Sequence, residues 1–464
     1  MTLEELKKYN HIHLIGIGGI SMSAVAETLL NWGFKVTGSD STESEITNKL
    51  KEHGIEVTIG HDLENPKIAD LIVFSAAISD EDPEMILAKE SHKKIVGRGE
   101  FVGWLTSLYN ESICVSGTHG KTTTTSMISV CFVEAQFDPT IQVGALLKDI
   151  GGNYRVGNSE YFILESCEYK ANFLQFIPNT EVILNIDNDH LDFYKTFDNI
   201  VKAFTDFAKI PDETGCVVVN ADDKNCLNLK DVVKGTFITY GVENQEADFI
   251  AKDISFNDNG FAKFKVYKKG NFVEEIELSV AGSHNVLNAL ACFAVCDYYK
   301  MNPETIRTAL KKFTGAERRL EYKGTFNDVS IFDDYGHHPT EILATSKAIK
   351  NKKYNESWVI FQPHTYSRTL THLDSFAKVL ENFDNVIVVD IYAAREKNTF
   401  GISSKDLVDK MNSNGKNAIY MPDFNEVAKY IKENAKPKDL VLTLGAGTVT
   451  NIGPMILDLE LSKI

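Results

Sequence analysis

The chain has 464 residues, of which 43% are hydrophobic and 10% aromatic, so it can bury several hydrophobic cores. At the usual domain size, this length predicts about three domains. Its 48 basic and 65 acidic residues give a net charge of −17, which argues against nucleic acid or an anionic membrane as the main partner, because both need a dense basic surface.

The sequence carries no predicted targeting or membrane segment. Met1–Lys8 is charged and lacks the apolar core and cleavage site of a signal peptide. No apolar run approaches the roughly 20 residues that a bilayer requires. The seven cysteines are scattered without a C-x-x-C pair, which indicates reduced thiols. These features predict a cytoplasmic protein.

The first predicted domain, residues 1–108, alternates apolar runs of strand length with helical patterns. His11–Ile17, Phe34–Ser39 and Leu71–Ser75 are typical of buried strands, and Ile20–Trp32 is typical of a helix. Such alternation predicts a parallel sheet covered by helices. We therefore expect a Rossmann-like N-terminal domain.

A glycine-rich turn joins the first of these strands to the first helix. In Gly16-Ile17-Gly18-Gly19-Ile20-Ser21 the glycines let backbone amides approach a phosphate at a helix N-terminus. Asp40 follows about twenty residues later, where a Rossmann fold contacts a ribose. Because Ser21 takes the place of the third glycine of G-x-G-x-x-G, three interpretations stay open at this point. They are a turn without ligand, a dinucleotide site and a site for a nucleotide-diphosphate sugar.

The second predicted domain, residues 109–314, has an α/β part followed by a β-rich part. Its apolar runs of strand length are 112–116, 161–164, 181–186, 215–220, 236–240 and 261–280. The last run contains a hairpin signal at Gly270-Asn271. This pattern predicts a P-loop ATPase-like central domain with a small antiparallel sheet beside the main one.

A second glycine-rich turn follows the strand-like run that ends at Ser116, and it opens a Thr-rich helix. It is formed by Gly117, Thr118, His119, Gly120, Lys121, Thr122 and Thr123. This context is typical of a phosphate loop, in which amides cradle the phosphates, the lysine reaches the outer phosphates and a hydroxyl binds Mg²⁺. The usual G-x-x-x-x-G-K spacing is not met, because position 115 is valine. We expect all seven residues to bind ATP.

Two side chains beyond neighbouring strand-like runs complete a predicted metal site with Thr122. Glu165 ends one run, and His190 lies just past the next. Ligands gather at the carboxyl ends of strands in such sheets, so both residues can face the phosphate loop. A carboxylate and a hydroxyl suit Mg²⁺, while imidazole is a less usual ligand. A structural histidine and a solvated acidic turn are the alternatives.

The shortened loop G-T-x-G-K-T resembles the signature of the Mur and folylpolyglutamate ligases, and later motifs extend the resemblance to the Mur ligase family over essentially the whole chain. Gly282–Ala289 is similar to the family's H-N-x-x-N-A helix start. The resemblance implies that His284, Asn285 and Asn288 lie near the adenine and phosphates of ATP. Without the other motifs, a helix cap with buried amides would be the preferred interpretation.

The third predicted domain, residues 315–464, returns to alternating strands and helices and is expected to be Rossmann-like. Its strand-like runs are 329–332, 358–362, 386–389 and 440–444. In the family, an arginine beside the domain junction belongs to the ATP site. The resemblance assigns this role to Arg319 of the Arg318-Arg319 pair, and an exposed basic pair is the alternative.

One segment of the third domain resembles the alanine-adding members of the family closely. Asp333–Pro339 reads D-D-Y-G-H-H-P. The resemblance implies that Asp334 belongs to the nucleotide or metal network. It also implies that Tyr335 and His337 lie near the incoming amino acid.

A second segment, Phe361–Arg368, is similar to the part of the family that holds the carboxylate of the amino acid. Thr365 replaces one of the two arginines found there. His364 and Arg368 remain as the expected amino-acid ligands, since an arginine can hold a carboxylate in a bidentate fork.

The resemblance also implies that the N-terminal domain binds the UDP part of a UDP-sugar rather than NAD. The expected contacts are Gly18, Gly19, Ile20 and Ser21 at the diphosphate, Asp40, Ser75 and Ala77 at the nucleoside, and Arg98 at the sugar-diphosphate. Glu165-Ser166-Cys167-Glu168 departs from the common E-A-D-E run, and Ser21 replaces a glycine. Neither change removes a residue with an assigned role.

Together these motifs imply an ATP-dependent ligase of peptidoglycan precursor synthesis that joins L-alanine to the lactyl carboxylate of UDP-N-acetylmuramate through an acyl phosphate. The expected cofactors are ATP and Mg²⁺. The expected catalytic residues are Lys121, Glu165, His190, Arg319, Asp334 and His337. The chain is expected to act as a monomer or homodimer, without a nucleic-acid or membrane partner.

Four other functions compete with this one. A sister ligase attaches a recycled tripeptide to the same UDP-sugar, but the third-domain motifs, including Asp390–Glu396, favour the addition of alanine. Folylpolyglutamate synthase lacks a UDP-binding first domain. A nucleotide-dependent oxidoreductase leaves Lys121 unexplained. A non-catalytic nucleotide-binding regulator would be expected to lose Lys121, Glu165 or His190, and all three are present.

Overall fold

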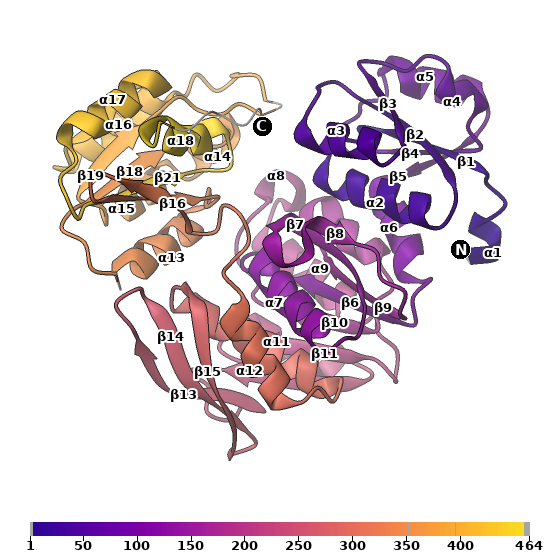
Figure 1. Cartoon of the computed structure of the whole chain (residues 1–464), viewed down its shortest axis with the longest axis horizontal. Coiled ribbons are helices and arrows are strands. Elements are labelled where there is room, and N and C mark those ends of the chain that lie inside the picture. The colour runs from indigo at the N-terminus through magenta and orange to yellow at the C-terminus, as the bar shows by residue number, and fades with distance from the viewer. Residues whose placement is uncertain (1–2, 351, 395, 459–464) are drawn as a thin grey trace.

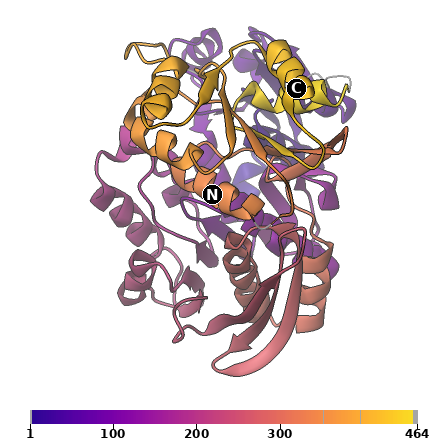
Figure 2. The same ribbon diagram turned by 90° about the vertical axis from the view of Figure 1, so that its left-hand side faces the viewer.

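The computed structural model describes residues 3–350, 352–394 and 396–458. Met1, Thr2 and Arg395, which belong to segments used above, lie outside this part of the chain, as does the end of the third predicted domain beyond residue 458. The described strands form three sheets of five, ten and six strands in chain order. Figure 1 shows the corresponding three lobes around a common centre, and Figure 2 shows the C-terminal sheet above the strands of the central lobe.

The N-terminal lobe is a parallel sheet in the order β3-β2-β1-β4-β5 with helices on its faces. Its strands are β1 (His11–Ile15), β2 (Lys35–Asp40), β3 (Glu56–Ile59), β4 (Leu71–Phe74) and β5 (Lys94–Gly97). Its helices are α1 (Leu3–Leu6), α2 (Ile20–Asn31), α3 (Glu45–Glu52), α4 (Asn65–Ile68), α5 (Pro83–Glu90) and α6 (Arg98–Thr106). The strand order reverses between β1 and β4, so this sheet has a switch point where ligands of such folds bind.

The glycine-rich turn lies at this switch point, between β1 and α2. Gly16 has φ +80°, a conformation that favours glycine. Gly38 on the neighbouring strand lets the turn pack closely, since a Cβ there would lie 2.6 Å from Ile17 Cδ1 of the turn. Both glycines therefore bring the backbone of the turn against the sheet.

The central lobe has a sheet in the order β15-β14-β13-β12-β11-β10-β6-β9-β7-β8. Its strands are β6 (Glu111–Ser116), β7 (Thr140–Leu147), β8 (Gly152–Arg155), β9 (Tyr161–Glu165), β10 (Thr180–Ile183), β11 (Cys216–Asn220), β12 (Thr236–Gly241), β13 (Phe249–Phe256), β14 (Phe261–Lys268) and β15 (Asn271–Ala281). The hairpin expected within 261–280 is present as β14 and β15, and β13, a strand that was not predicted, pairs with β14. They do not stand as a sheet beside the main one, because β13 pairs with β12 and continues it.

The helices of the central lobe cover both faces of its parallel part. They are α7 (Lys121–Glu134), α8 (Leu191–Tyr194), α9 (Phe197–Phe207), α10 (Lys224–Leu227), α11 (His284–Tyr298) and α12 (Pro303–Lys312), with 3-10 helices η1 (Lys148–Ile150), η2 (Tyr169–Gln175) and η3 (Asn228–Val232). The hairpin expected at Gly270-Asn271 joins β14 to β15, and Gly270 has φ +81°. A positive φ in a tight turn is the reason for a glycine at this position.

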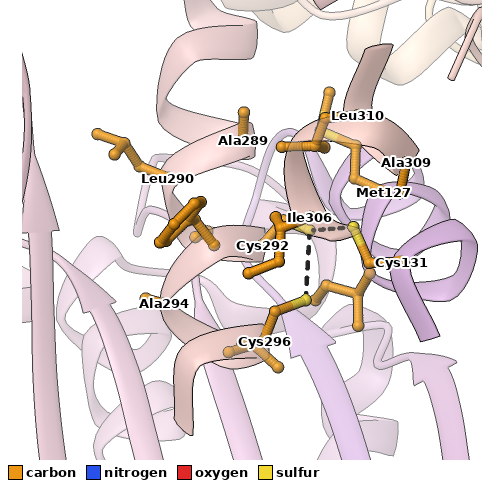
Figure 3. Close-up of a cluster of buried hydrophobic side chains, with 14 of the residues drawn as sticks. Met127, Cys131, Ala289, Leu290, Cys292, Ala294, Cys296, Ile306, Ala309 and Leu310 are labelled. Atoms are coloured by element: carbon orange, nitrogen blue, oxygen red, sulfur yellow. Dashed lines mark hydrogen bonds between the residues drawn. The ribbon is translucent and has the colours of Figure 1, made fainter. Parts of the chain in front are cut away.

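Helices α7 and α11 pack against each other in the largest hydrophobic core. Figure 3 shows Cys131 of α7 beside Cys292 and Cys296 of α11, with 3.6 Å between the Cys131 and Cys292 sulfur atoms. The first turns of the two helices also adjoin, since a Cβ on Gly120 would lie 2.8 Å from Asn288 Oδ1. The core thus holds the phosphate loop beside the start of α11.

The C-terminal lobe has a sheet in the order β16-β17-β21-β18-β19-β20, in which only β16 is antiparallel to its neighbour. Its strands are β16 (Glu321–Phe326), β17 (Val329–Asp334), β18 (Ser357–Phe361), β19 (Asn385–Val388), β20 (Ala418–Tyr420) and β21 (Leu440–Leu444). Its helices are α13 (Pro339–Lys350), α14 (Tyr366–Thr371), α15 (Leu373–Leu380), α16 (Ser404–Ser413), α17 (Phe424–Asn434), η4 (Thr448–Asn451) and α18 (Ile452–Ile456). Across the described residues of all three lobes, every helix falls short of the length and apolarity that crossing a membrane requires.

Candidate active site

The phosphate loop connects the buried strand β6 to α7. Gly117 and Gly120 have φ values of +134° and +87°, so two of its positions favour glycine. Lys121 Nζ donates to the Gly117 carbonyl oxygen at 2.6 Å and pairs with Glu168 Oε2 at 2.9 Å. Burial alone would lower the pKa of Lys121, but Glu168 raises it above its usual value. The loop therefore presents a lysine that stays charged.

The three residues of the predicted metal site line one cavity of about 560 Å³, which we call the junction cavity. Thr122, Glu165 and His190 lie there together with Lys121 and Arg319. Glu165 accepts a hydrogen bond from the Gly144 amide through one oxygen, at 2.8 Å. The hydroxyl and carboxylate oxygens fit Mg²⁺, and the imidazole is the less usual donor of the set. The metal assignment stays a prediction.

A neighbouring cavity of about 450 Å³, the loop cavity, holds most of the remaining residues predicted to bind ATP. They are His119, Gly120, Thr123, His284, Asn285, Asn288 and Arg319. Asn285 Nδ2 donates to the Ala281 carbonyl oxygen at 2.7 Å, and Asn288 Nδ2 donates to Asn285 Oδ1 at 2.9 Å. These buried amides hold the start of α11 and at the same time line the cavity.

Apolar side chains form much of the wall of the loop cavity, and no motif had singled them out. They are Leu184, Ile186, Tyr240, Val280 and Leu287. Such a wall suits the flat face of a base. His284 at the same wall is neutral, because burial and then Arg319 lower its pKa to about 4.

The two arginines at the domain junction have different surroundings. Arg319 donates to Thr122 Oγ1 at 3.3 Å and so reaches the phosphate loop from the C-terminal lobe. Arg318 instead donates to Asp333 at 3.0 Å and to the Gly445 carbonyl oxygen at 2.6 Å. Both arginines line the junction cavity, but of the two Arg319 alone also lines the loop cavity.

Asp334 lies at the edge of the loop cavity, at the end of β17. Its carboxylate accepts the backbone amides of Leu320 at 2.7 Å and Gly336 at 2.8 Å. Burial raises its pKa to about 6, although Arg319 opposes this shift. The carboxylate thus holds the backbone of Leu320, which lines the loop cavity, and of Gly336 just past β17.

A third cavity of about 860 Å³, the outer cavity, lies on the C-terminal side and is lined by His337, His364 and Arg368. Arg368 and His364 contact each other at 3.1 Å, and the rings of His337 and His364 are 5.5 Å apart. Tyr335, the fourth residue predicted for the amino acid, lines the junction cavity instead. Its ring lies under the Arg319 guanidinium at 5.4 Å.

The residues predicted for UDP lie around the N-terminal glycine turn. The Gly18 amide donates to Asp40 Oδ2 at 2.9 Å, and Arg98 donates to Ser21 Oγ at 3.0 Å. Ser75 packs beside Gly16, since a Cβ added to this glycine would lie 3.0 Å from the Ser75 Cβ. Ser75 Oγ accepts a hydrogen bond from the Ala77 amide at 3.3 Å. Gly19 directly precedes α2, and Ile20, its first residue, lines the junction cavity, so this turn faces the other two lobes.

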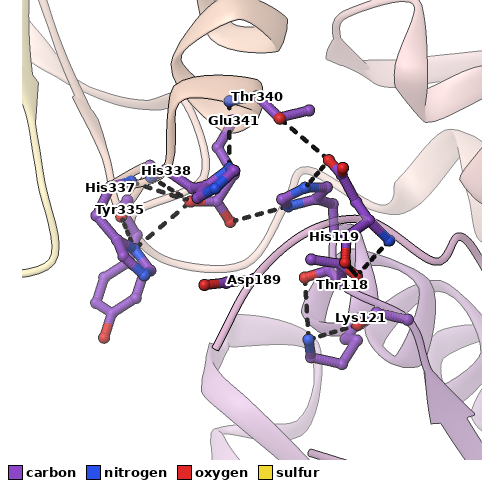
Figure 4. Close-up of polar contacts among 12 residues, drawn as sticks. Thr118, His119, Lys121, Asp189, Tyr335, His337, His338, Thr340 and Glu341 are labelled. Carbon is purple, nitrogen blue, oxygen red and sulfur yellow. Dashed lines mark hydrogen bonds and ion pairs between the residues drawn. The ribbon is translucent and has the colours of Figure 1, made fainter. Parts of the chain in front are cut away.

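Three acidic residues of the site were not assigned a role from the sequence. Glu168 pairs with Lys121 and lies 3.4 Å from His190 Nε2. Asp189 lies 3.8 Å from Arg368. Glu341 lines both the loop cavity and the junction cavity, and Figure 4 shows it facing His119 of the phosphate loop. Glu168 was visible in the E-S-C-E run, whereas the other two carried no local signal.

Comparison with known proteins adds an independent observation. Residues 11–110 match the profile described as "Mur ligase family, catalytic domain", residues 115–296 match "Mur ligase middle domain", and residues 318–447 match "Mur ligase, glutamate ligase domain". The chain belongs to the Mur ligase family. The family membership and the three-part α/β fold expected from the motifs are thereby confirmed.

Two curated Mur ligases illustrate how far the similarity extends. The UDP-N-acetylmuramate–L-alanine ligase of Acetivibrio thermocellus is 47% identical over 98% of this chain and 97% of its own length. The enzyme of the same name from Clostridium perfringens is 44% identical over 98% of this chain and 100% of its own length. The similarity therefore includes all three lobes.

Solved Mur ligase structures share the arrangement of the lobes. The UDP-N-acetylmuramate–alanine ligase of Thermotoga maritima superposes with a TM-score of 0.83 at 30% identity, covering 97% of this chain and 98% of that one. A murein peptide ligase from Psychrobacter arcticus reaches a TM-score of 0.73 at 23% identity, with the same coverage. The second likeness concerns the fold alone.

Proposed function

We propose that this Mur ligase joins L-alanine to the lactyl carboxylate of UDP-N-acetylmuramate, with conversion of ATP to ADP and phosphate, in peptidoglycan precursor synthesis (EC 6.3.2.8). Relatives of that name at 44–47% identity over about 98% of the chain support the reaction. The observation that carries it is the junction cavity, where Lys121, Arg319 and the predicted metal ligands come together from two lobes.

The chemistry needs an activated carboxylate, because a free carboxylate is a poor electrophile. Transfer of the γ-phosphoryl group of ATP gives an acyl phosphate, which the neutral amine of alanine attacks before phosphate leaves. Lys121 and Arg319 neutralise charge on the transferring group, and positioning supplies most of the remaining rate. Closure of the lobes excludes water that would hydrolyse the acyl phosphate.

A magnesium ion would be held by Thr122, Glu165 and His190, and it would supply positive charge at the outer phosphates of the nucleotide. Glu168 then has a separate task. It holds Lys121 at 2.9 Å and lies 3.4 Å from His190, so it orients two of the groups that approach the phosphates.

The acceptor is proposed to bind in the outer cavity. Arg368 faces this cavity and can hold the carboxylate of alanine. His337 lies between this cavity and the junction cavity, since it lines both. Burial lowers its pKa, so the imidazole is neutral and can accept a proton from the amine or orient it.

The UDP part is proposed to bind at the N-terminal turn, with Gly18, Gly19, Ile20 and Ser21 around the diphosphate. Asp40, Ser75 and Ala77 would contact the nucleoside, and Arg98 the sugar-diphosphate. The contact between Arg98 and Ser21 at 3.0 Å supports a shared anion site.

The proposal also includes domain boundaries near residues 108 and 315. It includes a cytoplasmic location and a monomeric or homodimeric state.

The test is an assay of phosphate release with ATP, Mg²⁺ and UDP-N-acetylmuramate, in which the amino acid is varied. We expect release with alanine, weaker release with serine or glycine, and background release with the tripeptide that the sister ligase uses. Release with the tripeptide but not with alanine would assign the chain to that sister activity. No release with any donor and acceptor would remove the ligase proposal.

A further inference from the structure

Glu341 is the third residue of α13 and belongs to none of the motifs discussed above. Its side chain is 17% exposed and lines both the loop cavity and the junction cavity. It therefore lies between the proposed sites of ATP and of the reacting groups. Its two carboxylate oxygens have different partners (Figure 4).

One oxygen holds the loop that carries the two histidines of the D-D-Y-G-H-H-P segment. Glu341 Oε2 accepts the backbone amides of His337 at 3.0 Å and His338 at 3.1 Å. The same oxygen lies 3.5 Å from His337 Nδ1. A glutamate at the third helical position that accepts the amide before the helix is half of a capping box. The path of the histidine loop thus depends on this carboxylate.

The other oxygen faces the phosphate loop in the central lobe. Glu341 Oε1 lies 3.8 Å from His119 Nδ1, and His119 Nε2 lies 3.0 Å from Asp187 Oδ2. Asp187 Oδ2 also accepts from Thr340 Oγ1 at 3.1 Å. His119 is therefore placed between two carboxylates, one from each lobe, directly before Gly120 and Lys121.

The charges in this contact make it sensitive to separation. Burial would lower the pKa of His119, but Asp187 and then Glu341 raise it to about 9, so the ring is a cation at neutral pH. A largely buried charge that loses its partner is costly. Movement of the histidine loop away from the phosphate loop would leave His119 with Asp187 alone and would take this cation away from Glu341.

We propose that Glu341 is a positioning residue that holds the amino-acid-binding loop in register with the phosphate loop through His119. The inference rests on the ligase function proposed above and adds a residue pair to it. Glu341 acts on the acceptor through the backbone and side chain of His337. Its contact with His119 sets the position of His337 relative to the phosphate loop of the central lobe. The pair aligns the amine of the acceptor with the phosphorylated carboxylate.

The first experiment uses Glu341→Gln, which keeps an oxygen for the two backbone amides and removes the charge. At saturating ATP, we expect the KM for alanine to rise at least about tenfold, as for the loss of one partner of a buried pair, while the affinity for ATP changes by less than about twofold. A wild-type KM for alanine, or an equal loss of affinity for ATP, would overturn the proposal.

The second experiment approaches the pair from the other lobe with His119→Asn. His119 contacts the C-terminal lobe through Glu341 and, by way of Asp187, through Thr340, so we expect the KM for alanine to rise here too, and the double variant isolates the part that passes through Glu341. In the double variant the two effects on kcat/KM for alanine should not multiply. Multiplication of the two effects would show that the residues act separately and would contradict the coupling.

Glu304→Gln is the matched control, because Glu304 also lies in the first turn of a helix, α12, but its side chain is 71% exposed and lines none of the three cavities. We expect it to leave both constants unchanged. Thermal unfolding of each variant separates capping from coupling, since a lower Tm with wild-type kinetics would mean capping alone and refute the inference. Absence of alanine-dependent phosphate release in the wild-type enzyme would instead refute the proposed alanine ligase function.

Discussion

Lys121 and Glu168 form a buried ion pair behind the phosphate loop, and their pKa values shift in opposite directions. Burial disfavours both charges, but Glu168 raises the pKa of Lys121 and Lys121 lowers that of Glu168. Both groups thus remain charged over the range in which enzymes of this kind work. Removal of one leaves the other buried without a partner.

The Lys121→Ala variant should lose at least about a hundredfold in kcat, by analogy with the loss of a key electrostatic donor. The physical reason is that charge on the transferring phosphoryl group is no longer offset. Steady-state phosphate release at saturating substrates measures this. Turnover close to that of the wild type would show that Lys121 does not contact the reacting phosphate.

The His337→Ala variant should raise the KM for alanine and leave the affinity for ATP nearly unchanged. His337 lines the outer and junction cavities but is absent from the lining of the loop cavity, so its loss affects the acceptor side. Titration of ATP by calorimetry, beside kinetics with varied alanine, separates the two effects. A pure loss of ATP binding would contradict the assignment.

Local motifs predicted the residues whose neighbours in sequence are also neighbours in space. Lys121 and Thr122 follow from a strand, a glycine turn and a helix, and the structure places them with Glu165 and His190 in one cavity. Glu341 faces His119, which lies 222 positions earlier in the chain. No short pattern records a contact of that kind, and its role emerges only from the packing of two lobes.

Strand β10 is fully buried, yet it contains an ionisable side chain. Glu181 is fully buried within it, and neither carboxylate oxygen has a hydrogen-bond partner among the described residues. Burial raises the pKa of Glu181 well above its usual value. The proton is therefore held more tightly in the folded state than in the unfolded chain.

The raised pKa of Glu181 determines how the free energy of unfolding depends on pH. The contribution of Glu181 is fully present below its unfolded pKa of about 4.3 and is lost as the pH rises toward the folded value. Glu181→Met should accordingly stabilise the protein at pH 8 by about 1–3 kcal/mol, and by less at pH 5. Urea unfolding at both pH values measures the difference, and an equal change at the two would contradict a raised pKa.

Periodicity found most elements but not all of their partners. The strands flanking the phosphate loop were predicted because long apolar runs indicate burial on both faces of a strand, and the structure confirms them. The short strands β3, β5, β8 and β20 lack such runs and were not predicted, and the longer strands β7, β13 and β16 were not predicted either. The continuation of the central sheet into β13 was also missed, because an alternating pattern shows which face of a strand is buried but not which strand it joins.

The whole molecule brings its three lobes together at the junction cavity. Ile20 comes from the N-terminal lobe, Lys121 from the central lobe and Arg319 from the C-terminal lobe. Arg319 and Thr122 are in contact across the last two. A site assembled from three bodies is complete only when all three are close together.

Binding of ATP and UDP-N-acetylmuramate should therefore reduce the radius of gyration in solution. Small-angle X-ray scattering of the protein alone, with each ligand and with both gives the measurement. The largest decrease is expected with both, since the ligands then join all three lobes. Identical scattering in the four states would count against closure as part of the reaction.

The central sheet ends at β15, and that edge carries its own safeguard. Glu274, Glu275 and Glu277 lie along the strand, and its register with β14 is interrupted twice. Each carboxylate pairs with a basic side chain, Glu274 with Arg307, Glu275 with Lys263 and Glu277 with Lys311, so a second copy that tried to extend the sheet would disturb these ion pairs and meet an irregular backbone. The edge of the ten-stranded sheet is thus poorly suited to pairing with a second copy of the chain.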